Sequence, residues 1–318
     1  FTQEVDIKPS LSPTPKPKII TSPVAVKIPI PTKYKGPPKI AIIIDDFGNG
    51  LENEKKILEL PYKLNISVIP ELPKSTSIAE IAYKNDKTVL IHLPMESISK
   101  HEETPFRIMS SMSSAEIKSI IERSVESVPH AQGVNNHEGS LATSDEELMY
   151  KVFKEIKEKG FFFVDSATTI RTRCKNAAIH AGIPYARRKV FLDNKDDPEY
   201  VKGQLKKAKE IARKVGMVVV IGHPRNSTIT ALKEELPEIE KEGFELVSVK
   251  ELVRVPPKDE MEPPLMVKDN KIERVQKPML SPVHTRKTEI KQVRENPGDK
   301  GTNVLEIIET EEYIEGDG

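Results

Sequence analysis

Between residues 39 and 255, short apolar runs alternate with longer segments in which apolar residues recur at helical spacing. The short runs are rich in Ile and Val and bordered by Pro or Gly, which is typical of strands buried in a parallel sheet. We expect strands at 40–44, 64–69, 88–93, 161–164, 190–193, 217–221 and 244–247, and a short apolar step at 133–134. We expect helices at 51–60, 75–84, 114–128, 172–181, 198–215 and 227–241, and another one that begins with a capping box at Ser144 and Glu147.

This alternation predicts an α/β protein with a parallel sheet. Roughly seven or eight consecutive βα units favour a closed or nearly closed barrel. An open, doubly wound sheet is the competing architecture.

Proline marks both flanks of this region. Residues 1–38 combine frequent Pro with Lys, Ser and Thr, which predicts a disordered, extended linker. Residues 256–318 form a charged, proline-interrupted segment with weak periodicity, which we expect to be a mostly disordered tail. The expected organisation is therefore a linker at 1–38, a barrel domain at 39–255 and a tail at 256–318.

Composition narrows the classes of function. The chain carries 49 basic and 49 acidic residues, so no global basic field argues for nucleic-acid binding. Cys174 is the single cysteine, which excludes an intramolecular disulfide and a zinc site of several cysteines. No apolar run reaches membrane-spanning length. Because the first residue is Phe1 rather than Met, we expect that an N-terminal segment, with an export signal or anchor, has been removed.

Ionisable and polar residues follow nearly every predicted strand. They are Asp45-Asp46, His92, Asn136-His137, Asp165-Ser166, Asp193 and His223. In a βα barrel the carboxyl ends of the strands meet at one face, where active sites lie. Each residue alone also fits a turn, a cap or a buried structural role. Their coincidence at one face favours a functional site.

The residue types predict a hydrolytic metal site. One carboxylate and two imidazoles can hold a divalent metal and leave positions open, and our candidate ligands are Asp46, His92 and His137. Asp45 is then available as general base and His223 as general acid for a leaving amine.

Further residues near these positions are candidates for supporting roles. Asp165 or Asp193 would fix the tautomer of a histidine. Asn136, Ser166, Glu96 and Ser140 are candidate substrate contacts, hydrogen-bond donors or additional ligands. Zn²⁺ suits the mixed N/O set, and Mn²⁺, Co²⁺ or Ni²⁺ would also fit.

At these residues the sequence resembles the divergent polysaccharide deacetylases, a branch of the NodB-like carbohydrate esterase superfamily. The resemblance extends from about Pro37 to Val255. The motifs that carry it are Ile44-Asp-Asp-Phe-Gly48, Leu90-Ile-His-Leu-Pro-Met-Glu96, Gly133-Val-Asn-Asn-His-Glu-Gly-Ser140, Phe163-Val-Asp-Ser166, Val190-Phe-Leu-Asp-Asn194 and Ile221-Gly-His-Pro224.

The resemblance implies a distorted (β/α)7 barrel that removes acetyl groups from N-acetylated envelope glycans, with metal-bound water attacking the acetamide carbonyl. It implies that Asp45 is the base, Asp46 a ligand and His223 the late catalytic histidine. The sequence departs from the wider superfamily at Glu96, where the second histidine of a His-x-x-x-His motif is missing. It also has Ala167 where Arg is expected and Glu138 where an apolar residue is usual.

Two hypotheses follow. The first is a secreted or periplasmic metal-dependent deacetylase of peptidoglycan or a chitin-like polysaccharide. The second is an envelope module without strong catalysis that binds glycan or a protein partner through the same barrel. The combined presence of Asp45, Asp46, His137 and His223 favours the enzyme, because a binding module has no need of a base, a metal and an acid.

Overall fold

The computed structural model describes residues 36–98, 106–263, 265–268, 271–274, 287–294 and 303–310. The predicted linker lies outside these residues except for Gly36, Pro37 and Pro38. The main sheet contains β1 (Lys39–Phe47), β2 (Asn65–Val68), β3 (Thr88–Met95), β4 (Ala131–Glu138), β5 (Phe162–Asp165), β6 (Tyr185–Arg187), β7 (Val190–Phe191), β8 (Met217–Gly222) and β9 (Glu245–Leu246).

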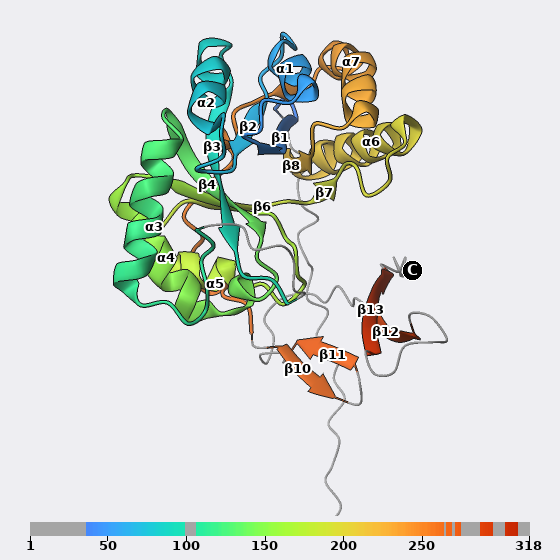
Figure 1. The fold of residues 1–318 in the computed structure, drawn as a ribbon. Helices are drawn as coiled ribbons and strands as arrows, with labels where there is room; N and C mark the ends of the chain where they lie inside the picture. Colours follow the sequence, from blue (N-terminus) through green and yellow to red (C-terminus); the bar gives the residue numbers. More distant parts are fainter. Residues whose placement is uncertain are drawn as a thin grey trace, which may run out of the picture. The chain divides into compact units, whose positions relative to one another are not determined.

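Helices cover the outer face of this sheet (Figure 1). They are α1 (Glu52–Leu58), α2 (Ser75–Lys84), α3 (Ser114–Ser127), α4 (Glu146–Glu158), α5 (Cys174–Ala181), α6 (Pro198–Val215) and α7 (Asn226–Lys241), with short 3-10 turns η1 (Ala142–Ser144), η2 (Val249–Glu251) and η3 (Lys258–Glu260). These bounds agree with the predicted helices to within a few residues. Asp145, rather than Ser144, caps α4 by accepting from two backbone N–H groups.

The strand order confirms the predicted distorted barrel. The order runs β6-β5-β4-β3-β2-β1-β8-β7, without the reversal that defines a doubly wound sheet. The strands β6 and β7 lie at opposite ends of this ladder, yet only Arg188 and Lys189 separate them in sequence. The chain itself therefore joins the two edges. The path contains eight strands. If β6 and β7 are counted as one interrupted strand, the number is seven, as expected.

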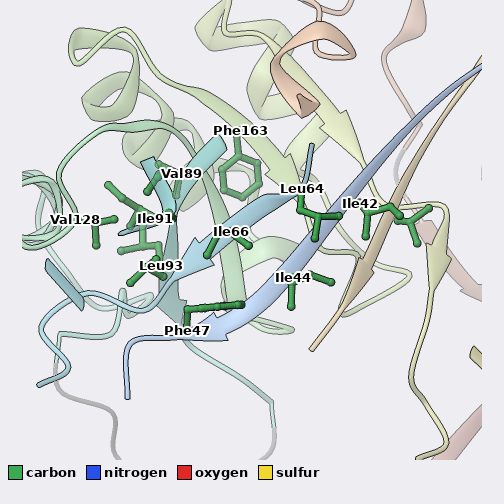
Figure 2. Close-up of a cluster of buried hydrophobic side chains, with 14 of the residues drawn as sticks. Ile42, Ile44, Phe47, Leu64, Ile66, Val89, Ile91, Leu93, Val128 and Phe163 are labelled. Carbon is green, nitrogen blue, oxygen red and sulfur yellow. The ribbon is translucent and has the colours of Figure 1, made fainter. Parts of the chain in front are cut away.

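Side-chain alternation divides the core into two layers. In β1, Ile40, Ile42 and Ile44 pack with the buried faces of the helices. Figure 2 shows part of this outer layer, with residues of β1, β2 and β3. The alternate residues, Ala41 and Ile43, pack inside the barrel with residues of β3, β5, β8 and the segment 247–252. This period of two decides which polar side chains at the strand ends face the interior.

The folded region extends past Val255. The side chain of Asn176 donates to Glu262 O at 2.9 Å, and Glu262 N donates back to Asn176 Oδ1 at 2.8 Å. Arg173 Nη1 donates to Pro263 O at 3.1 Å. Because these contacts attach residues 256–263 to α5, we propose that the domain boundary lies beyond Pro263 rather than at Val255.

Within the predicted tail, the structure contains strands that the sequence analysis did not assign. They are the antiparallel pairs β10 (Leu265–Lys268) with β11 (Lys271–Arg274) and β12 (Lys287–Arg294) with β13 (Asn303–Thr310). The charged, proline-interrupted composition of this segment concealed them, because its apolar periodicity is weak. In the described parts of the chain, no helix combines the length and apolarity that a membrane crossing needs.

Candidate metal and catalytic centre

The three predicted ligands lie together at the carboxyl ends of β1, β3 and β4. Asp46 Oδ1 is 3.2 Å from His92 Nε2 and 3.0 Å from His137 Nδ1. One ligand atom from each of the three residues lies within 4.8 Å of the others. The structure therefore brings together the Asp-His-His group that the sequence predicted.

Asp46 reaches this group through a local distortion of β1. Strict alternation would direct Asp46 outward with Ile42 and Ile44, because Ile43 and Asp45 occupy the inward positions. The pairing register of β1 with β2 shifts between Ile44 and Phe47, and Asp46 adopts a positive φ of 63°. A non-glycine residue in this left-handed region is strained, and such strain clusters at functional sites.

Two neighbouring strand ends carry the same feature. Glu138, the last residue of β4, has φ 52°, and Ala167, just after β5, has φ 54°. The buried carboxylate of Glu54 in α1 accepts from two backbone groups of the loop after β1, Asn49 N at 3.2 Å and Gly50 N at 2.8 Å. These contacts hold the β1–α1 loop next to Asp46 in one conformation.

The adjacent carboxylates have different environments. Asp45 is 3 % exposed, and burial raises its pKa despite the positive charge available at His92 and His223. Burial also opposes ionisation of Asp46, but hydrogen bonds from His137 and His92 hold its pKa well below the usual range. Asp45 Oδ2 lies 3.7 Å from His92 Nε2, so it faces the same centre.

His223 enters the centre from β8 and is oriented by Asp193. Its Nδ1 lies 3.0 Å from Asp193 Oδ1, and its backbone N–H donates to Asp193 Oδ2 at 2.7 Å. Thr228 also donates to Asp193 Oδ2, at 3.0 Å. The Nε2 atom of His223 faces Asp46 Oδ2 at 3.6 Å.

Asp193 also contributes to the pKa of His223. Burial favours the neutral imidazole, but the hydrogen bond to Asp193 and the charges of Asp46 and Asp45 raise the pKa of His223. Burial likewise disfavours the Asp193 carboxylate, yet the bond from His223 lowers its pKa. This pair has the form of a histidine held ready to donate a proton.

Of the two aspartates predicted to orient a histidine, only Asp193 does so. Asp165 lies on the outer face of β5, one residue after the inward-facing Val164. Its carboxylate accepts from Thr172 Oγ1 at 2.9 Å and from Tyr185 OH at 3.1 Å. Of the two alternatives, the geometry therefore favours Asp193, because strand alternation directs Asp165 to the outer face.

The other predicted residues form hydrogen bonds with neighbouring segments. Asn136 links two loops by accepting from Ser166 N at 2.8 Å and donating to Glu138 O at 2.7 Å. Glu96 accepts from the hydroxyl of Ser110 at 2.6 Å. Ser140 Oγ accepts from Ile98 N at 2.9 Å. Neither Glu96 nor Ser140 is part of the Asp-His-His group found among the described residues.

Sequence reasoning missed Asn135, which lies fully buried between Asp45 and His92. It donates from Nδ2 to Asp45 Oδ1 at 2.9 Å, and its Oδ1 lies 3.0 Å from His92 Nδ1. The available signal was the period of two: Val134 packs in the outer layer, so Asn135 and His137 face inward and Asn136 does not.

Comparison with known proteins places this centre in a family. The family described as divergent polysaccharide deacetylase matches residues 42–253. The chain belongs to this family. The divergent polysaccharide deacetylase match includes all three members of the Asp-His-His group, as well as Asp45, Asp193 and His223.

Among the relatives, the chain is 35% identical over 226 residues to the uncharacterized protein YibQ of Escherichia coli K12, covering 71% of this chain and 70% of the relative. It is 33% identical over 224 residues to an uncharacterized protein of Haemophilus influenzae, covering 69% of this chain and 80% of the relative. The fold is similar to a crystal structure of an uncharacterized Agrobacterium tumefaciens protein, with TM-score 0.66, 18% identity and coverage of 70% and 92% of the two chains.

The donor set of this member of the divergent polysaccharide deacetylase family fits a divalent metal. His92 Nε2 faces the carboxylates of both Asp45 and Asp46, and His137 Nδ1 faces Asp46. Such a convergence of acceptor atoms requires positive charge, from protons or from a cation. Two imidazoles and one carboxylate are a ligand set that leaves further coordination positions open.

Proposed function

We propose that this protein is a metal-dependent amide hydrolase that removes N-acetyl groups from a cell-envelope polysaccharide, either peptidoglycan or a chitin-like glycan. The observation that supports this function is the convergence at one barrel end of the Asp-His-His group, a buried carboxylate at Asp45 and the His223–Asp193 pair. Membership in the divergent polysaccharide deacetylase family supports the substrate class.

Asp46, His92 and His137 would hold the metal, and Zn²⁺ suits their mixture of nitrogen and oxygen donors. When bound, the cation would supply a Lewis acid toward water and the acetamide carbonyl. The ligand residues come from three separate strands of one sheet. The rigid barrel therefore sets the spacing of the donor atoms before any metal binds.

Asp45 is suited to take a proton from the attacking water. Its Oδ1 accepts from Asn135 Nδ2 at 2.9 Å, which leaves Oδ2 toward the centre. As the water oxygen forms its bond to the acetamide carbon, one water proton moves to Asp45 Oδ2. General base catalysis of this kind contributes roughly 10²–10⁴-fold in rate.

His223 is suited to protonate the leaving nitrogen. Its Nδ1–H is bound to Asp193, so a second proton on Nε2 would face the centre. When the C–N bond breaks, this proton passes to the nitrogen, and the products are acetate and a free amino sugar. The negative charge of Asp193 stabilises the imidazolium before the transfer.

The substrate class implies the place of action. Peptidoglycan and chitin-like glycans lie outside the cytoplasm, so we infer that the protein acts in the periplasm or cell envelope. The equal numbers of basic and acidic residues agree with a neutral or weakly charged glycan rather than a nucleic acid.

Acetate release from N-acetylated chitooligosaccharides and from peptidoglycan tests this function. We expect activity that chelator removes and Zn²⁺ restores, and that Asp45→Asn abolishes without loss of bound metal. Asp86→Asn, at an exposed turn that precedes β3, is the matched control and should keep activity. Stoichiometric metal without acetate release from either glycan would instead favour the glycan-binding module.

A further inference from the structure

Asn135 occupies the middle of the centre without being a ligand, base or acid. It lies in β4, paired with His92 of β3 on one side and Val164 of β5 on the other. Its side chain is completely buried. A buried amide with unsatisfied donors or acceptors would be destabilising, so the partners of Asn135 are informative.

All four hydrogen-bonding positions of the amide have partners. Nδ2 donates to Asp45 Oδ1 at 2.9 Å and to Ser166 Oγ at 3.2 Å. Oδ1 accepts from the Ser67 hydroxyl and lies 3.0 Å from His92 Nδ1. Two donors and two acceptor positions are the full capacity of an amide.

These contacts determine the orientation of the amide. An ionised carboxylate can only accept, so the NH₂ group must face Asp45. The amide oxygen then faces His92 Nδ1, and because oxygen only accepts here, Nδ1 must carry the hydrogen. In the neutral ring the lone pair is therefore on Nε2, the atom that faces Asp46 at 3.2 Å.

We propose that Asn135 is a positioning residue that sets the Nδ1–H tautomer of His92 and the orientation of the Asp45 carboxylate together. The tautomer directs the Nε2 lone pair of His92 to the metal position. The bond to Asp45 Oδ1 leaves Oδ2 directed to the centre, where it lies 3.7 Å from the same Nε2 atom. One amide thereby couples metal binding to the placement of the base.

The alternative tautomer would place a hydrogen on His92 Nε2, where it would donate to Asp46 and block ligation. Groups that orient a ligating histidine through its other ring nitrogen are worth roughly 10–100-fold in metal affinity. Asn135 differs from the usual carboxylate in this role because it is neutral. A carboxylate there would repel Asp45, whereas the NH₂ group of Asn135 stabilises it.

Asn135→Ala, compared with Asn65→Ala, tests this role. Asn65 is also completely buried, donates to Ile42 O at 2.9 Å and accepts from Val249 N at 2.7 Å. It begins β2, at the opposite end of the barrel interior from Asn135. Both variants should lower the melting temperature, but only Asn135→Ala should change the metal site.

Three measurements on each protein distinguish positioning from general stabilisation. Chelator competition should show Zn²⁺ affinity roughly 10–100-fold lower for Asn135→Ala and unchanged for Asn65→Ala. Long-range ¹H–¹⁵N correlation on metal-free protein, at a pH above the titration of His92, should show the Nδ1–H form in the wild type and Asn65→Ala. In Asn135→Ala the Nε2–H form should appear. In the acetate-release assay of Asn135→Ala, the fall in kcat should be larger than the change in KM.

Asn135→Asp tests the same proposal if Asn135→Ala does not fold. It keeps an acceptor for His92 and removes the donor to Asp45, so the tautomer should persist while turnover falls. A wild-type tautomer and Zn²⁺ affinity in Asn135→Ala would overturn the proposal, as would equal loss of affinity in Asn65→Ala. The prediction for kcat rests on the proposed function. The tautomer of His92 and the Zn²⁺ affinity are measured without turnover, so the positioning role and the proposed function can fail separately.

Discussion

Asp45 and Asp46 are consecutive residues whose carboxylates face one centre with opposite shifts in pKa. Burial raises the pKa of Asp45, and hydrogen bonds from His137 and His92 lower that of Asp46. The difference arises from the backbone, because the positive φ of Asp46 turns its side chain toward the histidines. Two identical residues are thereby suited to different roles, proton acceptor and metal ligand.

The ligand assignment predicts that His137→Ala loses tight metal binding. One of three protein ligands disappears, and Asp46 also loses the hydrogen bond at 3.0 Å. Metal content after dialysis and chelator competition measure the effect. His180→Ala is the matched control, since His180 contacts Glu146 on the outer helices at 3.3 Å. Stoichiometric metal at unchanged affinity in His137→Ala would show that His137 is not a ligand.

The His223–Asp193 pair predicts a shift in the pH dependence of turnover. The acid form of His223 is required, so activity is present below its pKa and lost as the pH rises through it. The pKa of His223 is raised above 6.5, with Asp193 as a main cause. Asp193→Asn removes that negative charge, so the alkaline limb of kcat should move to lower pH.

A pH–rate profile of Asp193→Asn measures this shift. Asp196→Asn changes an exposed aspartate in the same loop and should leave the alkaline limb in place. If the alkaline limb of kcat is unchanged in Asp193→Asn, a group other than His223 donates the proton.

Two glycine variants test the packing of the barrel, because they should change the free energy of unfolding in opposite directions. A Cβ at Gly133 would lie 2.4 Å from Phe162 Cε2, inside the barrel. Gly133→Ala should therefore destabilise by about 1–3 kcal/mol through overpacking. Gly203 lies exposed in α6 with nothing within 4 Å of the added Cβ, so Gly203→Ala should stabilise by about 0.5–1 kcal/mol. Denaturant unfolding of both proteins gives the two free energies, and equal signs would contradict this description of the core.

The domain boundary predicts a difference between two truncated chains. A chain of residues 39–263 should unfold like the full protein. A chain of residues 39–255 lacks the paired hydrogen bonds between Asn176 and Glu262. Each such bond contributes about 1 kcal/mol, so its Tm should be lower by several degrees. Equal Tm values would place the boundary at Val255 after all.

Much of this molecule could be predicted from the sequence. The alternation of apolar runs and helical segments predicted the parallel α/β barrel, because each run is long enough for one strand and apolar enough to be buried. Asp45, Asp46, His92, His137 and His223 were found because strand ends in such a barrel meet at one face. These inferences need only the order of elements along the chain.

The tertiary structure decided the rest. Pairing between strands placed Asn135 against Asp45 and His92, and alternation directed Asp165 outward to Tyr185. The register shift in β1 brought Asp46 to His92 and His137, against the alternation that a regular strand would impose. The physical reason is that element order is encoded locally, by residue type and spacing. The direction of a side chain at a strand end depends on backbone angles and on neighbours that are distant in the chain.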